Sequence, residues 1–340
     1  MLLVLVGVLL GLGASRLGAR PAPTPSVTSF ATAAPSPSGT SVPLAAPSPS
    51  GTSVPLAAPS PSADTETLVF AQPLSAGCAT DAGVWVVADG GGVARFADGR
   101  WSLIDPTLRS LVAVACTAGE AVAVGPAGRV LTADDLARTI TVDAAGPADL
   151  TAIAALPDGS ALAVGAAGTV LRRSGGWQPF ARGIEEDLLG VSFAGRASAW
   201  AVGIEGAAYR LEEPGWHALP TGLGLTLRAV SAGPELAVAV GDDGALLRWR
   251  GGWTRFASGT AATLRAVVLA GTVAWAAGDA GTALRMDLET ERAERIDLGT
   301  SCTVRSVFLR GSEVWFVASA GTRAAVWRRD AGGLRRWGVC

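Results

Sequence analysis

Two amino acids are missing from this chain altogether. All 27 basic residues are arginine, and the sequence contains neither lysine nor asparagine. Without asparagine, the chain has no N-x-[ST] acceptor for an N-linked glycan. We interpret the exclusive use of arginine as a sign of GC-rich coding, and we therefore expect a bacterial origin.

Charge and histidine are both scarce. The formal net charge is −2, so the chain has no bulk electrostatic attraction for nucleic acid, and we expect no nucleic-acid partner. His217 is the only histidine, which excludes a metal site built from several histidines. The sequence also has no zinc-type ligand spacing, no phosphate-binding glycine loop and no Ser-His-Asp set. We predict no cofactor, no metal and no catalytic residue.

Long apolar runs are absent except at the N-terminus. Residues 2–14 read LLVLVGVLLGLGA and are followed by Arg16 and Arg20. The run is shorter than the ~20 residues of a spanning helix and has the length of a signal-peptide core, although no basic residue precedes it. We predict that residues 1–15 are a signal-peptide-like or membrane-anchor segment and the only membrane contact. The remainder is then extracytoplasmic, either secreted or anchored.

Residues 16–65 are rich in proline, serine and threonine. The segment AAPSPSGTSVPL occurs twice, at 33–44 and 45–56, and a third copy begins at Ala57. Such a tract has too few large apolar side chains to offset the conformational entropy lost on folding. We predict a disordered stalk that holds the following domain away from the N-terminal segment.

Glycine, with 44 residues, is abundant and periodic in the rest of the chain. One glycine per repeat aligns, at separations of 37, 40, 38, 38, 37 and 40 residues. The aligned glycines are Gly91, Gly128, Gly168, Gly206, Gly244, Gly281 and Gly321. A short apolar segment such as VAVG or WAVG precedes each of them, and an L-x-x-[VI] pattern lies further upstream.

Each repeat therefore offers four short strands in about 38 residues, which is typical of propeller blades. No segment shows a helical period long enough for a crossover helix, which argues against an α/β fold. We predict an all-β fold in which residues 66–340 form a monomeric, closed, seven-bladed β-propeller of four-stranded blades. The first strand of each blade lies innermost, and residues 67–70 are a candidate for an additional strand that seals the ring.

The repeat WAVG-x-x-G-x-[LIV]-x-R…GGW resembles the WD/YVTN/BNR-like repeat superfamily, and above all propellers similar to the photosystem II assembly and stability factor. Remnants of an Asp-box occur at Ala97–Trp101 and in the GGW sequences that end at Trp177 and Trp253. The resemblance covers residues 66–340 and implies a propeller with a basic patch for an acidic partner. Sialidase propellers use a tyrosine nucleophile, but Tyr209, the only tyrosine, occupies a repeat position otherwise held by leucine, so we predict that it is a core residue.

Arginine recurs four residues after the aligned glycine in five repeats, and Thr132 and Ala325 break the series. The recurring residues are Arg95, Arg172, Arg210, Arg248 and Arg285. One interpretation is structural, with each guanidinium bridging to an adjacent blade, and the other is a binding surface for an anionic partner. Two tryptophans outside the repeated positions, Trp249 and Trp327, are aromatic candidates for an exposed contact.

Acidic residues occur in several of the turns that link strands, at Asp89, Glu205, Asp242, Asp243 and Asp279. We interpret them mainly as turn formers, with a calcium or ligand rim as the alternative.

The four cysteines are spaced in two pairs of the same separation. Cys78 and Cys116 fall at matching points of the first two repeats, while Cys302 and Cys340 flank the last. In an oxidising compartment we predict two disulfides, Cys78–Cys116 and Cys302–Cys340, and the alternative is four buried free thiols.

These patterns indicate a non-catalytic binding or scaffold propeller that recognises a protein or glycan partner. One alternative is the sensor ectodomain of a longer membrane receptor, such as a bacterial receptor kinase. A glycan hydrolase or lyase is a weaker alternative, because it needs a cluster of carboxylates at the central channel.

Overall fold

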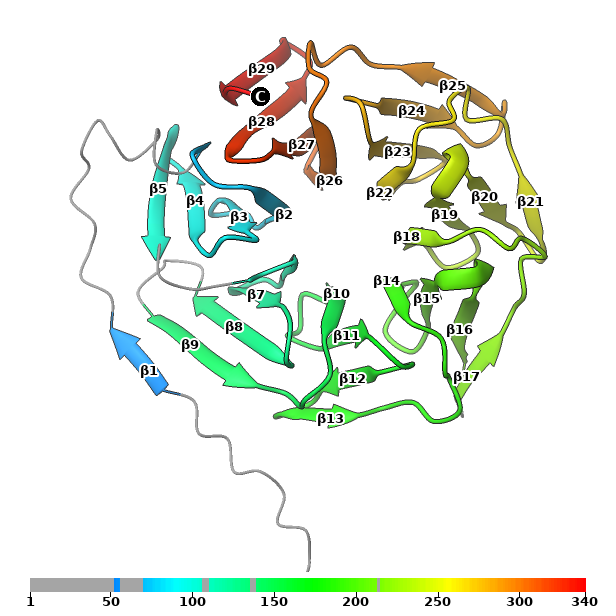
Figure 1. Cartoon of the computed structure of the whole chain (residues 1–340), viewed down its shortest axis with the longest axis horizontal. Helices are drawn as coiled ribbons and strands as arrows, with labels where there is room; N and C mark the ends of the chain where they lie inside the picture. The colour runs from blue at the N-terminus through cyan, green and yellow to red at the C-terminus, as the bar shows by residue number, and fades with distance from the viewer. Residues whose placement is uncertain (1–51, 56–69, 106–109, 135–138, 213–214) are drawn as a thin grey trace, which may run out of the picture. The chain divides into compact units, whose positions relative to one another are not determined.

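The computed structural model in Figure 1 describes residues 52–55, 70–105, 110–134, 139–212 and 215–340. The predicted N-terminal segment, residues 1–15, lies outside the described residues. The predicted stalk, residues 16–65, does so too, except for Thr52–Pro55. Within the described part, no helix is long and apolar enough to cross a membrane.

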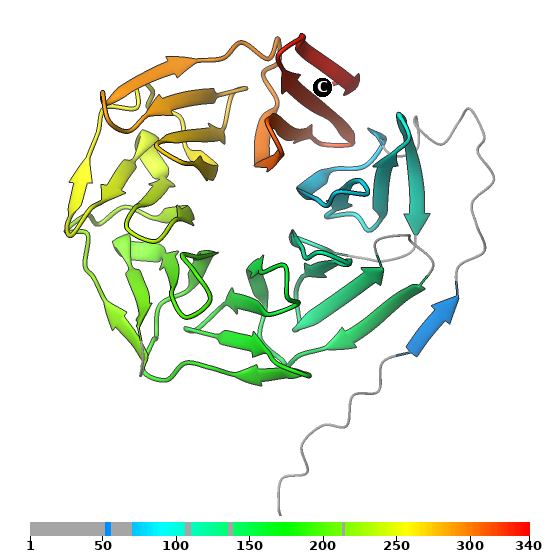
Figure 2. The same ribbon diagram turned by 180° about the vertical axis from the view of Figure 1, so that it is seen from behind.

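Residues 74–338 form seven antiparallel sheets arranged in a ring, which Figures 1 and 2 show from its two sides. Blade 1 contains β2 (Leu74–Ala79), β3 (Val84–Ala88), β4 (Val93–Ala97) and β5 (Arg100–Asp105). Blade 2 contains β6 (Ala113–Cys116), β7 (Glu120–Val124), β8 (Arg129–Asp134) and β9 (Thr139–Ala144). Blade 3 contains β10 (Leu150–Ala155), β11 (Ala161–Gly165), β12 (Val170–Arg173) and β13 (Trp177–Pro179). Blades 4 and 5 contain β14 (Leu188–Phe193), β15 (Ala199–Gly203), β16 (Ala208–Glu212), β17 (Gly215–Ala218); β18 (Leu227–Ala232), β19 (Ala237–Gly241), β20 (Leu246–Trp249) and β21 (Trp253–Arg255). Blades 6 and 7 contain β22 (Leu264–Ala270), β23 (Val273–Gly278), β24 (Ala283–Asp287), β25 (Arg292–Arg295); β26 (Thr303–Arg310), β27 (Glu313–Ala320), β28 (Arg323–Asp330) and β29 (Gly333–Gly338). Two 3-10 turns, η1 (Ile204–Gly206) and η2 (Asp242–Gly244), follow β15 and β19.

The order of strands across each blade is their order along the chain. The first strand of every blade lines the centre of the ring, and each first strand contacts the first strand of the next blade, with β26 against β2 closing the circle. The prediction of seven four-stranded blades with the first strand innermost is confirmed.

The second strand of each blade carries the main core. All five residues of β3, β11, β15 and β19 are buried. These strands are apolar on both faces because each blade packs between two neighbours, so neither face meets water. The apolar segments that precede the aligned glycines are therefore the blade interfaces.

The aligned glycines mark a close contact between backbones. Asp243 and Gly244 have successive positive φ values of 53° and 62°, as in the type I′ turn that glycine favours. A Cβ on Gly244 would lie 1.9 Å from the carbonyl oxygen of Thr260, so no side chain fits there. A Cβ on Gly128, Gly168, Gly206 or Gly281 would likewise lie 1.8–1.9 Å from a carbonyl oxygen. The period of the sequence in blades 2 to 6 is thus the period of this contact.

The ring closes between blades 7 and 1 without exchanging a strand, since β26–β29 and β2–β5 are each consecutive in the chain. The suggested sealing strand over residues 67–70 is wrong at Phe70, which lies outside the strands and packs against Trp101, while 67–69 lie outside the described residues. Aromatic rings fill the interface instead, and Trp315 stacks on Trp337 with centroids 5.5 Å apart. Ser319 adds a hydrogen bond from its hydroxyl to the carbonyl oxygen of Leu74 at 2.9 Å.

The four cysteines form the two predicted disulfides. Cys78 on β2 pairs with Cys116 on β6 and joins the inner strands of blades 1 and 2. Cys302 and Cys340 tie the start of blade 7 to its end. Each bridge spans 38 residues of sequence, about one repeat.

One short segment of the predicted stalk forms a strand. β1 (Thr52–Pro55) pairs antiparallel with β9 and makes a fifth strand at the outer edge of blade 2. The outer edge of a blade in this fold is thus able to accept a further strand.

Candidate functional site: the mouth of the central channel

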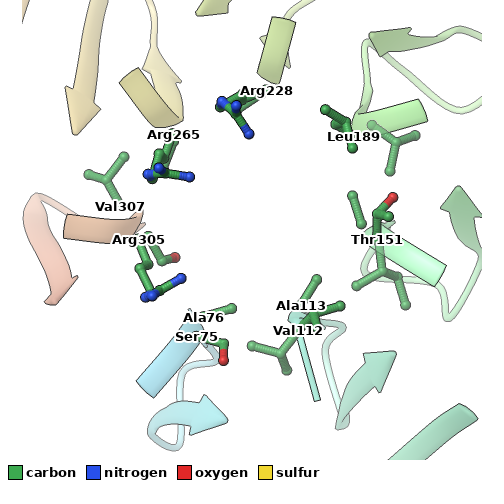
Figure 3. Close-up of a pocket in the computed structure, with 18 of the residues that line it drawn as sticks. Ser75, Ala76, Val112, Ala113, Thr151, Leu189, Arg228, Arg265, Arg305 and Val307 are labelled. Atoms are coloured by element: carbon green, nitrogen blue, oxygen red, sulfur yellow. The ribbon is translucent and has the colours of Figure 1, made fainter. Parts of the chain in front are cut away.

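A cavity of about 420 Å³ lies where the seven inner strands converge (Figure 3). Three arginines, Arg228, Arg265 and Arg305, extend into it from blades 5, 6 and 7. We call them the channel arginines. Among the described residues, no cluster of three or more His, Cys, Asp or Glu side chains is placed to hold a metal ion.

The same backbone irregularity positions each channel arginine. In β18, β22 and β26 the pairing register shifts around one residue, between Leu227 and Ala229, between Leu264 and Ala266, and between Val304 and Ser306. A β-bulge of this kind redirects the extra side chain. Each extra residue is an arginine that points to the channel, while the preceding Leu227, Leu264 or Val304 is buried.

Two of the channel arginines already have carboxylate partners. Nε of Arg228 donates to Oδ1 of Asp242 at 2.5 Å, and Nε of Arg265 donates to Oδ1 of Asp279 at 2.6 Å. A hydroxyl from the next blade also donates to each carboxylate, from Thr263 to Asp242 at 3.3 Å. These hydrogen bonds, led by the one from arginine, lower the pKa of Asp242 and of Asp279. Both carboxylates therefore stay ionised at neutral pH.

The third channel arginine has no such partner. Nε of Arg305 donates to the hydroxyl of Ser319 at 2.8 Å, because blade 7 carries serine where blades 5 and 6 carry aspartate. No ion pair of Arg305 occurs among the described residues. Arg305 is exposed, so its guanidinium presents donors to the channel mouth.

The rest of the mouth carries no charge at the position of the channel arginines. There, blades 1 to 4 carry Ser75, Val112, Thr151 and Leu189, which complete the circle of side chains in Figure 3. Blade 1 also contributes the exposed Asp89. The mouth thus combines one unpaired cation, a separate carboxylate, two hydroxyls and two aliphatic side chains.

The arginines predicted from the repeat lie elsewhere, on the third strand of each blade. Arg248 donates to the carbonyl oxygen of Leu288 in blade 6 at 2.5 Å, pairs with Glu291 at 3.1 Å and lies over the ring of Phe256. The other members of the series also pack on their own blades. Arg95 donates to the carbonyl oxygen of Ala82 and lies over the ring of Trp85. Arg210 forms an ion pair with Glu212 and lies over the ring of Trp200. Arg172 lies over the ring of Phe180, and Arg285 is paired in register with Trp275 on the neighbouring strand. Of these contacts, only those of Arg248 reach the adjacent blade as the structural interpretation expects, and a binding role for this series stays a prediction.

The series extends further than the sequence alignment indicates. Arg328 is opposite Trp315, as Arg285 is opposite Trp275, so Arg328 and not Ala325 holds this position in blade 7. The alignment on Gly321 is out of phase by three residues because β27 and β28 extend further than their counterparts, to Ala320 and from Arg323. We call Arg95, Arg172, Arg210, Arg248, Arg285 and Arg328 the third-strand arginines.

The proposal of exposed tryptophans is wrong for Trp327, which is 1% exposed and packs in the core between blades 6 and 7. The three-residue shift of the alignment in blade 7 explains this wrong prediction, because Trp327 occupies the position of the buried Leu284. Trp249 is half-buried against Trp200 and Trp253, with ring centroids 5.3 and 5.5 Å away.

The acidic turn residues divide into two groups. Glu205 and Asp243 adopt φ values of 55° and 53° in their turns, as turn formers do, while Asp242 and Asp279 hold channel arginines. Tyr209, predicted as a core residue, is only half-buried, and its hydroxyl donates to Glu186 at 2.6 Å. Burial raises the pKa of Tyr209 to about 12, so it stays protonated at neutral pH. His217 is exposed on β17.

The channel arginines are not among the residues predicted from the repeat, although the sequence carries a signal for them. They are the second residue of the L-x-x-[VI] pattern, in LRAV at 227 and 264 and in VRSV at 304. The first and fourth residues of that pattern mark the strand, and only its variable second residue distinguishes blades 5 to 7 from the other blades.

No protein-family model matches the sequence, and no curated protein matches it. Solved structures do match the fold. The WD40 propeller domain of Doa1 has a TM-score of 0.66 at 11% identity, covering 77% of this chain and 95% of its own. YCF48 bound to a D1 peptide has a TM-score of 0.62 at 15% identity, with coverages of 85% and 95%, and YCF48 from Cyanidioschyzon merolae has 0.61 at 14%, with 76% and 95%. The predicted resemblance to WD-repeat and photosystem II assembly factor propellers is thus confirmed at the level of fold.

Proposed function

We propose that this propeller is a non-catalytic binding scaffold whose channel mouth takes a protein segment bearing a carboxylate next to an aliphatic side chain. Arg305 carries the proposal, because it alone of the three channel arginines lacks a carboxylate within the described residues. A ligand carboxylate would accept hydrogen bonds from Arg305, as Asp242 does from Arg228 and Asp279 does from Arg265. Arginine suits this task since its planar fork binds a carboxylate through two parallel hydrogen bonds.

The remaining walls narrow the ligand further. Val112 and Leu189 offer apolar side chains on the same channel rim, and Asp89 offers an acceptor for an N–H donor. A cavity of about 420 Å³ is near the small end of ligand sites, which favours one or two residues of a peptide over a large molecule. A chain terminus and an internal glutamate share this chemistry.

The same geometry disfavours the hydrolase alternative. A general acid at neutral pH needs a raised pKa, whereas the carboxylates of Asp242 and Asp279 have lowered pKa values and are held by arginine. One structural neighbour is a propeller with a bound peptide, which supports a protein partner over a glycan. The two disulfides support an oxidising, extracytoplasmic setting.

The test uses the full chain and three acetylated probes: Gly-Ala-Ala-Leu with a free carboxyl, the same peptide amidated, and amidated Gly-Glu-Leu-Ala. We expect saturable binding of at least one carboxylate-bearing peptide and none of the amidated Gly-Ala-Ala-Leu, with the first and third probes distinguishing a terminus from a side chain. Arg305→Gln should weaken binding about tenfold, the scale of a hydrogen bond to a charged group.

Arg255→Gln is the matched control, because Arg255 is an exposed arginine on the outer strand β21 and the charge change is the same. Equal binding of the free and amidated peptides, or an equal loss in both variants, would overturn the proposal.

A further inference from the structure

Positive charge is concentrated in one blade. Residues 303–340 contain seven arginines and two acidic side chains, whereas the whole chain has a net charge of −2. The preceding repeat, residues 264–301, has four arginines and six acidic residues. Blade 7 is therefore a basic blade in a slightly acidic protein.

Three of these arginines are exposed on the two outermost strands of blade 7. Arg335 and Arg336 are exposed on β29, and Arg323 is exposed at the start of β28. Arg335 lies over the ring of Trp337, 4.9 Å from its centroid, which holds its guanidinium near the strand. None of these three arginines forms an ion pair with a described residue.

Exposed apolar side chains gather at the same edge. Leu334 is 43% exposed and Val339 is 68% exposed, and they are the exposed large hydrophobic residues of the described part of the chain. Both lie within or directly after β29. They place two apolar side chains close in sequence to the unpaired arginines of β29.

The backbone of β29 is also open on one side. β29 is the last strand of its sheet, so one row of its N–H and C=O groups has no strand partner among the described residues. Two other outer strands, β9 and β5, are also six residues long, but neither resembles β29. β9 is covered by β1, while β5 begins and ends with opposite charges, Arg100 and Asp105. β13 and β21 have only three residues, and β25 (RAER) mixes both signs.

We propose that β29 is a second binding site, which takes an extended acidic segment of a partner protein as an additional antiparallel strand. The partner's backbone pairs with the open edge of β29, its acidic side chains meet Arg335 and Arg336, and its aliphatic side chains cover Leu334. Strand addition of this kind is an established mode of peptide recognition, and the pairing of β1 with β9 shows that a blade edge of this propeller accepts it. The proposal is independent of the channel mouth.

The experiment measures binding of an acetylated, amidated peptide, Glu-Val-Thr-Val-Glu-Val, to the full chain by fluorescence anisotropy at low salt. Three comparison peptides accompany it, and the first, Lys-Val-Thr-Val-Lys-Val, tests the effect of charge. Glu-Val-Pro-Val-Glu-Val and Glu-Pro-Thr-Val-Glu-Val each lack one backbone N–H donor, at the third and at the second residue. Because alternate residues of a strand direct their N–H groups to opposite edges, only one of the two prolines removes a donor that faces β29. We expect the acidic peptide to bind, the lysine peptide not to bind, and one of the proline peptides to bind at least fivefold more weakly. Hydrogen exchange of the β29 amides should slow when the acidic peptide is bound.

The variant R335E/R336E should lose about tenfold in affinity, because two attractive charges become repulsive. R292E/R295E is the matched control, since Arg292 and Arg295 are exposed on β25, the outer strand of blade 6, and it should bind as the parent does. An equal loss in both variants would show attraction by bulk charge alone and overturn the site. Binding without protection of β29, or association of the chain with itself through this edge in place of peptide binding, would overturn it as well.

Discussion

The channel arginines and the third-strand arginines recur at fixed positions of the same repeat, yet they differ in what surrounds them. Arg248 on the third strand is held by a carbonyl oxygen, a carboxylate and an aromatic ring, from its own blade and the next. Arg305 on the innermost strand has a single hydroxyl partner and is exposed. The side chain is the same in both places, and the neighbouring residues decide whether its donors are used inside the fold, since Arg228 and Arg265 on inner strands donate to Asp242 and Asp279.

This difference shows that recurrence alone does not mark a binding site. The third-strand guanidiniums are explained by packing, because five of the six lie over an aromatic ring of their own blade. We propose a functional position where the blades differ, since blades 5 to 7 carry Arg228, Arg265 and Arg305 at the channel where blades 2 and 4 carry Val112 and Leu189. In this proposal, symmetric positions build the ring and asymmetric ones bind the partner.

The largest expected effect on stability comes from Arg248→Ala. The substitution leaves the carbonyl oxygen of Leu288 without its donor and removes the contact with Phe256, so we expect the free energy of unfolding to fall by about 1–3 kcal/mol. Chemical denaturation measures it, and channel-peptide binding should not change. Arg172→Ala is the control, because Arg172 is exposed with a ring contact only, and it should cost less than about 1 kcal/mol. Equal losses of unfolding free energy in the two variants would contradict the inference that the contacts of Arg248 stabilise the fold more than those of Arg172.

A smaller effect is expected from Arg265→Ala, and it depends on pH. Arg265 lowers the pKa of Asp279 in the folded state, so the ion pair contributes stability above the unfolded pKa of about 4 and loses it as pH falls through the lower folded value. The parent should therefore lose more stability than Arg265→Ala between pH 5 and pH 2. Urea denaturation at both pH values measures this, and parallel losses would contradict the assigned pairing.

The smallest effect is expected from Arg305→Gln. Its guanidinium is exposed and bonded to one hydroxyl, so unfolding free energy should change by no more than about 0.5 kcal/mol even as peptide binding falls. Arg228→Gln provides the comparison, since it leaves Asp242 without its arginine and should cost more. A larger loss for Arg305→Gln than for Arg228→Gln would place Arg305 among the structural arginines.

The fold was predictable because its signals are local and repeated. Gly244 and its counterparts in blades 2, 3, 4 and 6 are required by the same backbone contact, so their spacing gives the blade length directly. The disulfides followed from the same period, since Cys78 and Cys116 occupy matching points of neighbouring inner strands. Periodicity failed only in blade 7, where longer strands move Arg328 and Trp327 three residues out of phase.

The site was less predictable because it depends on what breaks the repeat. Whether Arg305 is paired depends on Ser319, a residue of another strand whose register no local pattern gives. The direction of the arginine side chains depends on a bulge, which the alternation of buried residues does not reveal. Comparing the variable position of L-x-x-[VI] across the repeats identifies the three arginines, but their partners require the structure.

The closure of the ring has a consequence for how such a chain changes in length and order. Because each blade is formed by one uninterrupted repeat, a duplication or deletion of one repeat adds or removes a whole blade and leaves no half-sheet. For the same reason, new termini placed between blades 3 and 4, with the present ends joined, divide no sheet. Each repeat is therefore a unit that can be added, removed or placed first in the propeller without dividing a sheet.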